Sequence, residues 1–407
     1  MTIKNLPIQP TLNLGIVGHV DHGKTTLTKL LSGKWTDTHS EEKKRGITIK
    51  LGYTNFTIYS DEDKTKFFVD KNKGKLALKK VSIVDAPGHE SFMATMISGA
   101  AIMDAALLLI AADEKCPQPQ TIEHLKTLEI SGIKDIIVIQ NKIDLVTKDE
   151  AIENFKEIKN FLKGTIAENS PIIPVSAQHG ANLSALLKYI SKLKDPIRDL
   201  ESNPHMYVVR SFDINKPGDD YSKLKGGVLG GSLKSGKLKV GDKIEIRPGI
   251  SKSKEGKTIY TPIKAEVMGL KSDKDNLEEA IPGGSVAIMT KLDPYLTKTD
   301  SLVGQIAGLE GDLPEPSSEI IFDINLFDKI ITSTKEFEVK PIIPNEPLML
   351  IVNSMTTVGI PFKVNPREAS VKLKRPVMAF NGDRVVIFKR FEGNKWRISG
   401  FGVIKNK

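Results

Sequence analysis

The pattern of hydrophobic and polar positions changes near residue 200. Before that point, short apolar runs alternate with segments whose apolar residues repeat with a helical period. Strand-like runs begin at Leu12, Val81, Ala106, Asp135 and Pro171, and helical patterns cover 90–104, 121–130, 150–163 and 181–193. This alternation predicts an α/β, doubly wound, mostly parallel sheet with helices on both faces. Ligand-binding loops are then expected at the carboxyl ends of the strands.

After residue 203 the pattern changes to short alternating runs separated by glycine, such as YVVRSFDI, KGGVLGGSL and VGDKIEIRPG. Runs of this kind are typical of antiparallel β-barrels. The acidic, proline-containing stretch at 309–319 marks a boundary, and a second β domain ends in a hairpin with its turn near Gly393. The sequence therefore predicts an α/β domain over 1–203 and two β-barrel domains over 204–319 and 320–407.

The octapeptide GHVDHGKT at 18–25 separates the first strand from the first helical stretch. It matches the G-x-x-x-x-G-K-[ST] phosphate-loop pattern in its strand–turn–helix setting, where a chance match is uncommon. Amides at the helix N-terminus favour a β-phosphate, while Lys24 would bridge the β- and γ-phosphates and Thr25 would ligate Mg²⁺. We expect nucleotide contacts from Asp21, His22, Gly23, Lys24, Thr25 and Thr26, with Asp21 also at the metal.

The segment DAPGH at 85–89 ends a second apolar strand. Asp85 is placed to hold Mg²⁺ through a water, and the Gly88 amide is placed to sense the γ-phosphate, since glycine allows close backbone approach. His89 follows that sensor and is the candidate for orienting the attacking water. Lys24, Gly88 and His89 are thus the expected catalytic residues. Without the other motifs, Asp85 would be better interpreted as a carboxylate in a turn at the end of a strand.

The segment NKID at 141–144 predicts the base. The Asp144 carboxylate can accept from N1–H and the exocyclic amine of guanine, whereas adenine offers neither donor there. GTP and GDP are therefore the expected nucleotides. Asn141 would tie neighbouring loops together, and the Lys142 stem would cover the base. Ser176 and Ala177, which follow a later strand, are expected to give the guanine O6 a backbone donor, and Gln178 is expected to contact the nucleotide as well.

The polar segment at 36–53 lies between the phosphate loop and DAPGH. Its charge and low apolar content suit a mobile loop. Thr48 would reach Mg²⁺ only when a γ-phosphate is bound, so this segment would become ordered with GTP and be released on hydrolysis.

Composition limits the protein class. At 39% hydrophobic residues, 407 residues suffice for several cores, and the longest apolar stretch is too short to span a membrane. The N-terminus lacks the pattern of a secretory signal. The single cysteine, Cys116, fits a reducing compartment, so we expect a cytoplasmic protein with no membrane association. The histidines other than His89 are expected to be loop-packing, surface or hydrogen-bonded residues.

The net charge of +9 resides in the C-terminal part, where 363–407 contain twelve Lys and Arg against three Asp and Glu. These basic residues are interleaved with Phe380, Phe388, Phe391, Trp396 and Phe401. Such a surface could face a phosphate backbone. A solvated basic face on a β domain is the equally weighted alternative.

With these elements in order, the chain resembles the translational GTPases, and most closely the gamma subunits of archaeal and eukaryotic translation initiation factor 2. GHVDHGKTTL and DAPGHESFMATMISGAAIMDAALLLIAA are shared by the superfamily, whereas KGTIAENSPIIPVSA and RSFDINKPG are particular to the gamma subunit. The short N-terminal arm is more similar to archaeal members. The resemblance implies a GTPase that carries initiator methionyl-tRNA to the small ribosomal subunit, together with alpha and beta subunits. It also implies that Tyr53 lies beside the pocket for the aminoacyl end, with Gly226 and Gly227 as vaguer tRNA-binding candidates.

The chain departs from many relatives between residues 60 and 80, where they carry a zinc knuckle of paired cysteines and this chain has none. We expect no zinc and a charged loop or hairpin instead. Two alternatives to the initiation carrier stay open on the sequence. One is an elongation-type carrier of aminoacyl-tRNA, including the selenocysteine-specific kind, and the other is a GTPase subunit of a sulfate-activating enzyme.

Overall fold

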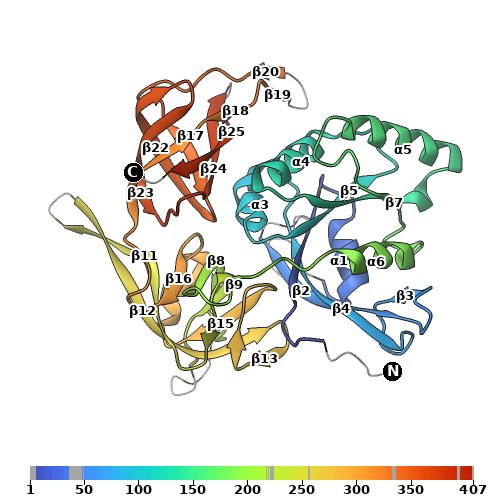
Figure 1. The fold of residues 1–407 in the computed structure, drawn as a ribbon, viewed down its shortest axis with the longest axis horizontal. Coiled ribbons are helices and arrows are strands. Elements are labelled where there is room, and N and C mark those ends of the chain that lie inside the picture. The colour runs from blue at the N-terminus through green and yellow to red at the C-terminus, as the bar shows by residue number, and fades with distance from the viewer. Residues whose placement is uncertain are drawn as a thin grey trace. The chain divides into compact units, whose positions relative to one another are not determined.

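The computed structural model describes residues 6–35, 48, 50–216, 218, 220, 224–254, 257–331, 336–391 and 395–405. Most of the segment expected to form the switch (36–47 and 49) and the turn expected near Gly393 lie outside the described residues. The chain divides into two compact units (Figure 1). Unit 1 comprises 1–197 with 283–285, and unit 2 comprises 198–282 with 286–407.

Unit 1 is built on a mostly parallel sheet. Within the described residues its seven strands lie in the order β3-β2-β4-β1-β5-β6-β7. Their bounds are β1 Leu12–Gly18, β2 Gly52–Ser60, β3 Phe67–Phe68, β4 Leu76–Asp85, β5 Ala105–Ala111, β6 Asp135–Asn141 and β7 Ile172–Pro174. The neighbours from β4 to β7 pair in parallel, while β2 runs antiparallel to β4. The carboxyl ends of five parallel strands therefore share one edge, as the sequence predicts.

Helices cover both faces of this sheet (Figure 1). They are α1 Lys24–Ser32, α3 Met93–Ala100, α4 Pro119–Ser131, α5 Lys148–Leu162 and α6 Leu183–Lys192, with short 3-10 turns at η1 Glu90–Phe92 and η2 Ile143–Leu145. The doubly wound prediction is confirmed. α3 ends four residues before the expected position because the chain there enters β5, with the Asp104 amide donating to the Asn13 carbonyl at 2.9 Å.

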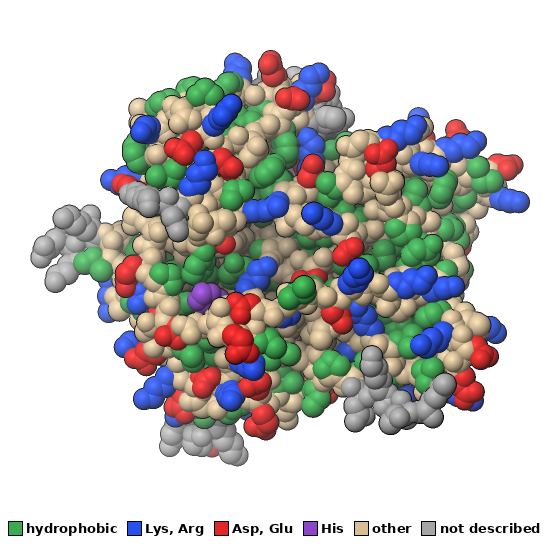
Figure 2. Space-filling view, viewed as in Figure 1, with side chains coloured by type: hydrophobic (Ala, Val, Ile, Leu, Met, Phe, Trp, Pro, Cys, Tyr) green, Lys and Arg blue, Asp and Glu red, His purple; other side chains and the backbone are tan. Residues whose placement is uncertain are grey.

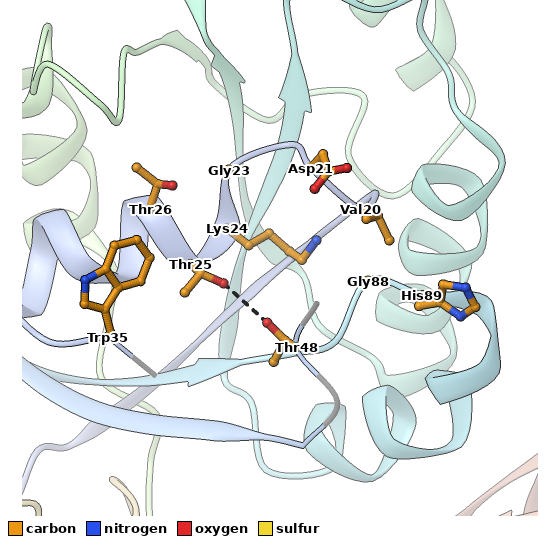
Figure 3. A pocket seen from close by; sticks show the side chains of 10 residues that line it. All are labelled: Val20, Asp21, Gly23, Lys24, Thr25, Thr26, Trp35, Thr48, Gly88 and His89. Carbon is orange, nitrogen blue, oxygen red and sulfur yellow. Dashed lines mark hydrogen bonds between the residues drawn. The ribbon is translucent and has the colours of Figure 1, made fainter. Parts of the chain in front are cut away.

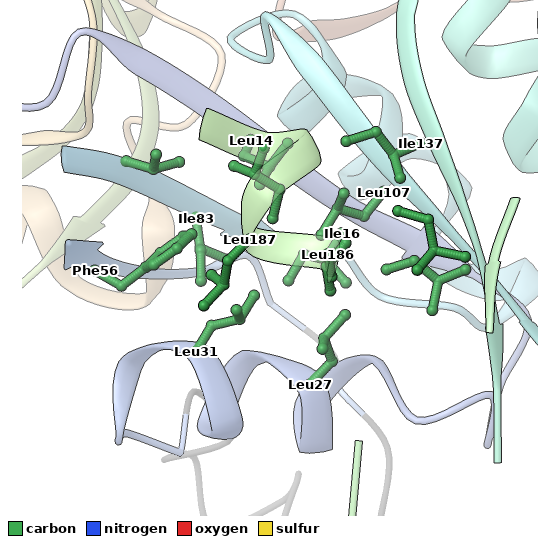
Figure 4. Close-up of a cluster of buried hydrophobic side chains, with 14 of the residues drawn as sticks. Leu14, Ile16, Leu27, Leu31, Phe56, Ile83, Leu107, Ile137, Leu186 and Leu187 are labelled. Atoms are coloured by element: carbon green, nitrogen blue, oxygen red, sulfur yellow. The ribbon is translucent and has the colours of Figure 1, made fainter. Parts of the chain in front are cut away.

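The core on one face of the sheet fixes α1 and α6. Leu14 and Ile16 alternate along β1 toward this face, which is the period expected of a strand. Leu27 and Leu31 are four positions apart on α1 and pack into the same cluster, together with Leu186, Leu187 and Ile190 of α6 (Figure 4). Burial of this apolar stripe anchors α1 directly behind the phosphate loop.

The excursion at 60–80 is a hairpin, one of the two expected forms. β2 and β4 pair from Gly52 with Asp85 to Ser60 with Leu76, and β3 extends the edge by pairing with Tyr59 and Ser60. The turn after β2 is held by Asp61, whose carboxylate accepts from the Thr65 and Lys66 amides.

Unit 2 contains two antiparallel barrels, as predicted. In the first, six described strands close a ring in the order β11-β16-β8-β9-β15-β12, with β12 pairing back to β11. The elements are β8 His205–Phe212, β9 Val228–Ser235, β10 Leu238–Lys239, β11 Lys243–Lys254, β12 Lys257–Ser272, β13 Asp275–Leu277, β14 Glu279–Ala280, β15 Val286–Thr290, η4 Pro294–Asp300 and β16 Ile306–Leu309. Closure leaves few exposed sheet edges.

The second barrel closes in the order β17-β23-β22-β21-β24-β25, with β17 pairing to β25. Its described strands are β17 Ser317–Asp323, β18 Asn325–Leu326, β19 Lys329–Ile331, β20 Glu336–Glu338, β21 Leu348–Val352, β22 Met355–Asn365, β23 Glu368–Val377, β24 Arg384–Phe391 and β25 Lys395–Lys405. A boundary after residue 319 would cut β17. We propose that the linker between the barrels is 310–316, and that the first unit ends near residue 197.

Candidate functional site: the phosphate loop and its neighbours

The phosphate loop connects β1 to α1 through two glycines that no other residue would replace without strain. Gly18 has φ +141°, and a β-carbon there would lie 2.4 Å from the Leu109 carbonyl oxygen. Gly23 has φ +88°, and its β-carbon would lie 2.3 Å from Asn141 Nδ2. Both clashes are with neighbouring strand ends. The loop is therefore tight because it must fit between β5 and β6.

Lys24 lies across the mouth of the loop. Its side chain is buried, and its Nζ donates to the His19 carbonyl oxygen. A β-carbon at Gly88 would lie 2.5 Å from this Nζ. The structure thus brings together two of the three expected catalytic residues, with the Gly88 backbone passing close to the lysine ammonium.

Thr25 and Thr48 meet at the start of α1. Their Oγ1 atoms are 3.3 Å apart, and Thr48 is buried (Figure 3). Asp85 is fully buried at the end of β4, where it pairs in register with Gly52 of β2 and Ile16 of β1. Two hydroxyls and a strand-end carboxylate supply oxygen donors only, the kind that Mg²⁺ prefers.

A cavity of about 240 Å³ lies over this loop. Its lining combines expected site residues with one that was not expected, and comprises Val20, Asp21, Gly23, Lys24, Thr25, Thr26, Trp35, Thr48, Gly88 and His89 (Figure 3). Asp21 adopts φ +61°, a conformation that Asp tolerates better than most residues. His89 lies at the edge of the cavity, where its Nδ1 accepts from the Ser91 amide at 3.2 Å. That bond leaves Nε2 to carry the proton of the neutral ring.

Asn141 joins the phosphate loop to the loop after β7. Its Nδ2 donates to the His22 carbonyl oxygen at 2.9 Å, and its Oδ1 accepts from the Ala177 amide at 3.0 Å. The Ser176 amide donates to the Ala181 carbonyl oxygen at 3.3 Å. Both amides therefore donate to protein acceptors in this arrangement, and their contact with the guanine O6 stays a prediction. Among the described residues, the Gln178 amide has no such partner.

Asp144 lies in η2, beside the loop that carries Ser176. The Ser176 hydroxyl is the main cause that lowers the pKa of Asp144, helped by its own backbone amide, His179 and Lys142. His179 Nε2 lies 3.6 Å from Asp144 Oδ2. Lys142 pairs with Asp113 at 3.0 Å, which holds its stem on the β5 side. The carboxylate therefore stays ionised near neutral pH, as an acceptor must.

Two histidines, His22 and His124, are fully buried beside the phosphate loop. His22 is fully buried, with Nδ1 3.0 Å from the Leu109 carbonyl oxygen and Nε2 3.4 Å from Glu114. His22 is not among the residues that line the cavity, so its expected contact with the nucleotide stays a prediction. His124 is also fully buried, and its Nδ1 accepts from the Gly18 amide at 2.8 Å. The helical spacing of Thr121, His124 and Leu128, which are all buried on α4, is the signal that places His124 inside.

The residues proposed to contact tRNA differ in their settings. Tyr53 is half-buried on β2, paired with Val84. At Gly226 and Gly227, β-carbons would lie 1.9 Å from the Thr290 carbonyl oxygen and 2.4 Å from Thr297 Cγ2. Close packing of the barrel already explains both glycines. Their contact with tRNA stays a prediction.

The basic C-terminal segment does not form one exposed surface. Lys389 points inward, and its Nζ donates to the carbonyl oxygens of Lys340 and Pro341, each at 2.8 Å, and lies 3.1 Å from Glu346. Phe388 is buried as well. Figure 2 shows basic side chains of the last barrel dispersed among acidic and hydrophobic ones. The expectation of an RNA-facing surface is therefore wrong for Lys389 and Phe388.

Comparison with known proteins assigns each part of the chain. Residues 9–196 match the family Elongation factor Tu GTP binding domain, and 226–307 match Elongation factor Tu domain 2. Residues 318–404 match Initiation factor eIF2 gamma, C terminal. Translation initiation factor 2 subunit gamma of Methanococcus maripaludis (strain C6) is 51% identical over 405 residues, 97% of this chain and 98% of that protein. The chain belongs to the translation initiation factor 2 gamma family. It is a translational GTPase with a GTP-binding domain of the elongation factor Tu type.

Other gamma subunits agree with this family assignment. That of Methanothermobacter thermautotrophicus is 50% identical over 406 residues, and that of Pyrococcus horikoshii is 49% identical over 406 residues, each with at least 98% of both chains covered. Among solved structures, elongation factor SelB from Methanococcus maripaludis with the GTP analogue GppNHp has a TM-score of 0.74 at 25% identity, covering 99% of this chain and 80% of that one. Bacterial EF-Sec has a TM-score of 0.73 at 26% identity, covering 97% and 58%. The selenocysteine factors thus share the fold at about half the identity of the gamma subunits.

Two further expectations concern metals and membranes. In the part of the chain that the structure describes, no three His, Cys, Asp or Glu side chains gather as a metal cluster would require. The expectation that the protein holds no zinc stays a prediction. No helix in the described ranges is both long and apolar enough to cross a bilayer.

Proposed function

We propose that this chain carries initiator methionyl-tRNA to the small ribosomal subunit in its GTP state, together with alpha and beta subunits, and that hydrolysis to GDP and phosphate releases the tRNA. Support comes from the family, since the gamma-type C-terminal match distinguishes the chain from elongation carriers. The selenocysteine carriers and the sulfate-activating GTPases lack that support.

The proposed switch mechanism rests on the 3.3 Å distance between the Oγ1 atoms of Thr25 and Thr48. Thr25 belongs to the phosphate loop, whereas Thr48 belongs to the segment before β2. A single Mg²⁺ ion bound to both threonines would link the nucleotide to the segment that contains Thr48. We propose that Thr25 and Thr48 hold Mg²⁺ directly, with Asp85 and Asp21 in its surroundings. When bound, Mg²⁺ would neutralise charge on the β- and γ-phosphates.

For hydrolysis, the chain's own residues act on the γ-phosphate. Lys24 would stabilise negative charge that shifts to the bridging oxygen as the bond from that oxygen to the γ-phosphorus breaks. The Gly88 amide would donate to a γ-phosphate oxygen. His89, with Nδ1 held by Ser91, would rotate from the edge to orient water through its ring. Loss of phosphate would remove the acceptor from Gly88 and so loosen both switch segments.

Discrimination between methionylated initiator and elongator tRNAs tests the carrier assignment. Filter binding would use the chain assembled with its alpha and beta subunits, GTP and Mg²⁺, and methionylated tRNAs of both kinds. We expect preference for the initiator by at least about tenfold, or about 1.4 kcal/mol. Equal binding, or preference for the elongator, would reject the initiation assignment. Uncharged initiator tRNA serves as the matched control and should bind more weakly.

A further inference from the structure

Trp35 lines the same cavity as the phosphate loop, although no motif includes it. It lies three residues after the end of α1 and is 53% exposed, in a chain with two tryptophans. A large aromatic side chain gains stability from burial. An indole left open beside a ligand cavity therefore has apolar surface that the protein itself does not cover.

The position of the indole is fixed by the end of α1. Gly33 adopts φ +72° and its amide donates to the Lys29 carbonyl oxygen at 2.8 Å, which turns the chain back along the helix. The Lys29 ammonium lies 4.3 Å from the centroid of the Trp35 ring. This cation–π contact holds the ring against the last turn of α1. Trp35 lines the cavity, whereas Lys29 does not.

The path of a bound nucleotide passes this position. Its phosphates would lie at Lys24 and Thr25, while Asp144 would hold the base. The loop after β7 lies beside α1, because Leu30 Cδ1 is 3.7 Å from the place of a β-carbon at Gly180. Thr26, Lys29 and Leu30 are three and four positions apart, so they form one face of α1. The sugar, which joins phosphate to base, must follow this face.

We propose that Trp35 is an additional nucleotide-binding residue whose indole packs against the ribose of a bound guanosine nucleotide. The proposal rests on the nucleotide site described above and adds a contact outside its motifs. Figure 3 shows Trp35 next to Thr26, on the opposite side of Thr25 from His89. Trp35 therefore serves affinity for GDP and GTP alike, because it lies on the side away from the γ-phosphate sensor.

Two single-tryptophan variants of the full chain test the contact. Trp396→Phe keeps Trp35 as the sole tryptophan, and Trp35→Phe keeps Trp396, which lies on β25 in unit 2. GDP would be titrated with Mg²⁺ while tryptophan emission is recorded, and calorimetry would measure binding independently. We expect a saturable emission change in Trp396→Phe that follows the calorimetric curve, and none in Trp35→Phe.

The rate of GDP dissociation distinguishes a direct contact between Trp35 and the nucleotide from an indirect effect of the substitution. Trp35→Ala should release GDP about threefold to tenfold faster, as expected for loss of one aromatic contact. Trp35→Phe should stay within about twofold of the wild type because it keeps an aromatic ring, and Trp396→Ala is the matched control with an unchanged rate. If GDP binds without changing the emission of Trp35, and Trp35→Ala leaves the GDP dissociation rate unchanged, the contact of Trp35 with the ribose is wrong but the nucleotide site stands. Absence of calorimetric GDP binding by the wild type would overturn the nucleotide site as well.

Discussion

The backbone amide of Gly18 donates a hydrogen bond to Nδ1 of His124 at 2.8 Å, inside the protein. The first residue of the phosphate loop is thus held by a side chain from α4, more than a hundred positions later in the chain. Only an imidazole with an unprotonated Nδ1 can accept this bond. Burial, followed by the charges of Lys24, His19 and His22, lowers the pKa of His124 well below its ordinary value. The neutral form therefore supports the loop.

Removal of this acceptor should weaken both fold and nucleotide binding. In His124→Ala the Gly18 amide stays buried without its partner, which costs about 1–3 kcal/mol in the free energy of unfolding. GDP dissociation should also accelerate, because the loop loses a support. His124→Gln offers an amide oxygen and should recover part of both losses.

The control for this change is Thr127→Ala on the same helix. Thr127 is fully buried, and its Oγ1 donates to the Glu123 carbonyl oxygen at 2.9 Å. We expect lower stability with an unchanged GDP dissociation rate, measured by denaturant unfolding and stopped flow. Equal acceleration in both variants would show that the effect of His124 is only general destabilisation.

The same histidine predicts a pH dependence of stability. In the unfolded chain His124 takes up a proton below about pH 6.5, whereas in the folded chain its lowered pKa keeps it neutral. The unfolded state then binds more protons, so the free energy of unfolding decreases as pH falls, by up to about 1.4 kcal/mol per pH unit for such a group. Between pH 7 and 5 the slope should be smaller in His124→Gln. An identical slope would contradict a neutral buried His124.

Asp144 is predicted to determine the base. Asp144→Asn replaces an ionised acceptor with an amide that donates, so it should lose GTP affinity by at least about tenfold, as expected for a hydrogen bond to a charged group. Xanthine carries a carbonyl where guanine carries its amine, so xanthosine triphosphate should bind the variant better than it binds the wild type.

The neighbouring carboxylate of Asp113 provides the control, since it pairs with Lys142 at 3.0 Å. Asp113→Asn should retain the preference for guanine. Competition between GTP and xanthosine triphosphate measures both variants, and an unchanged preference in Asp144→Asn would place the base elsewhere.

Lys389 is predicted to stabilise the last barrel instead of binding RNA. Lys389→Met removes the donor to the carbonyl oxygens of Lys340 and Pro341 and the partner of Glu346, so we expect a loss of about 2–3 kcal/mol in the free energy of unfolding. Arg390 is exposed and stacks on Trp396 at 4.7 Å. Arg390→Gln should therefore change stability little. If Lys389→Met reduced the salt dependence of RNA binding at wild-type stability, Lys389 would belong to an RNA surface after all.

Patterns that repeat within one element were predictable from the sequence. Apolar runs predicted β1, β4, β5 and β6. The short alternating apolar and polar runs separated by glycine predicted the two barrels. Motif spacing placed Lys24, Thr25 and Asp85 at one edge because the carboxyl ends of parallel strands share an edge. Family-like segments distinguished a gamma subunit from other translational GTPases.

Features that depend on packing between distant elements were not predictable. The spacing along α4 indicates that His124 is buried, but no local pattern encodes its partner, the Gly18 amide, or the carbonyl oxygens of Lys340 and Pro341 that accept from Lys389. The Ala177 amide is occupied by Asn141, a contact between two loops. Trp35 reaches the cavity only because Gly33 turns the chain back. Each of these contacts depends on tertiary geometry that composition and hydrophobic period do not contain.

In the proposed function, the bound nucleotide controls the affinity for tRNA. The most direct test compares the dissociation constant of initiator methionyl-tRNA from the assembled alpha, beta and gamma subunits with GTP and with GDP, each verified as bound. We predict at least about tenfold tighter binding with GTP, a coupling of about 1.4 kcal/mol, and loss of most of this difference in Thr48→Ala. Equal affinity in the two nucleotide states would show that the nucleotide does not control tRNA binding.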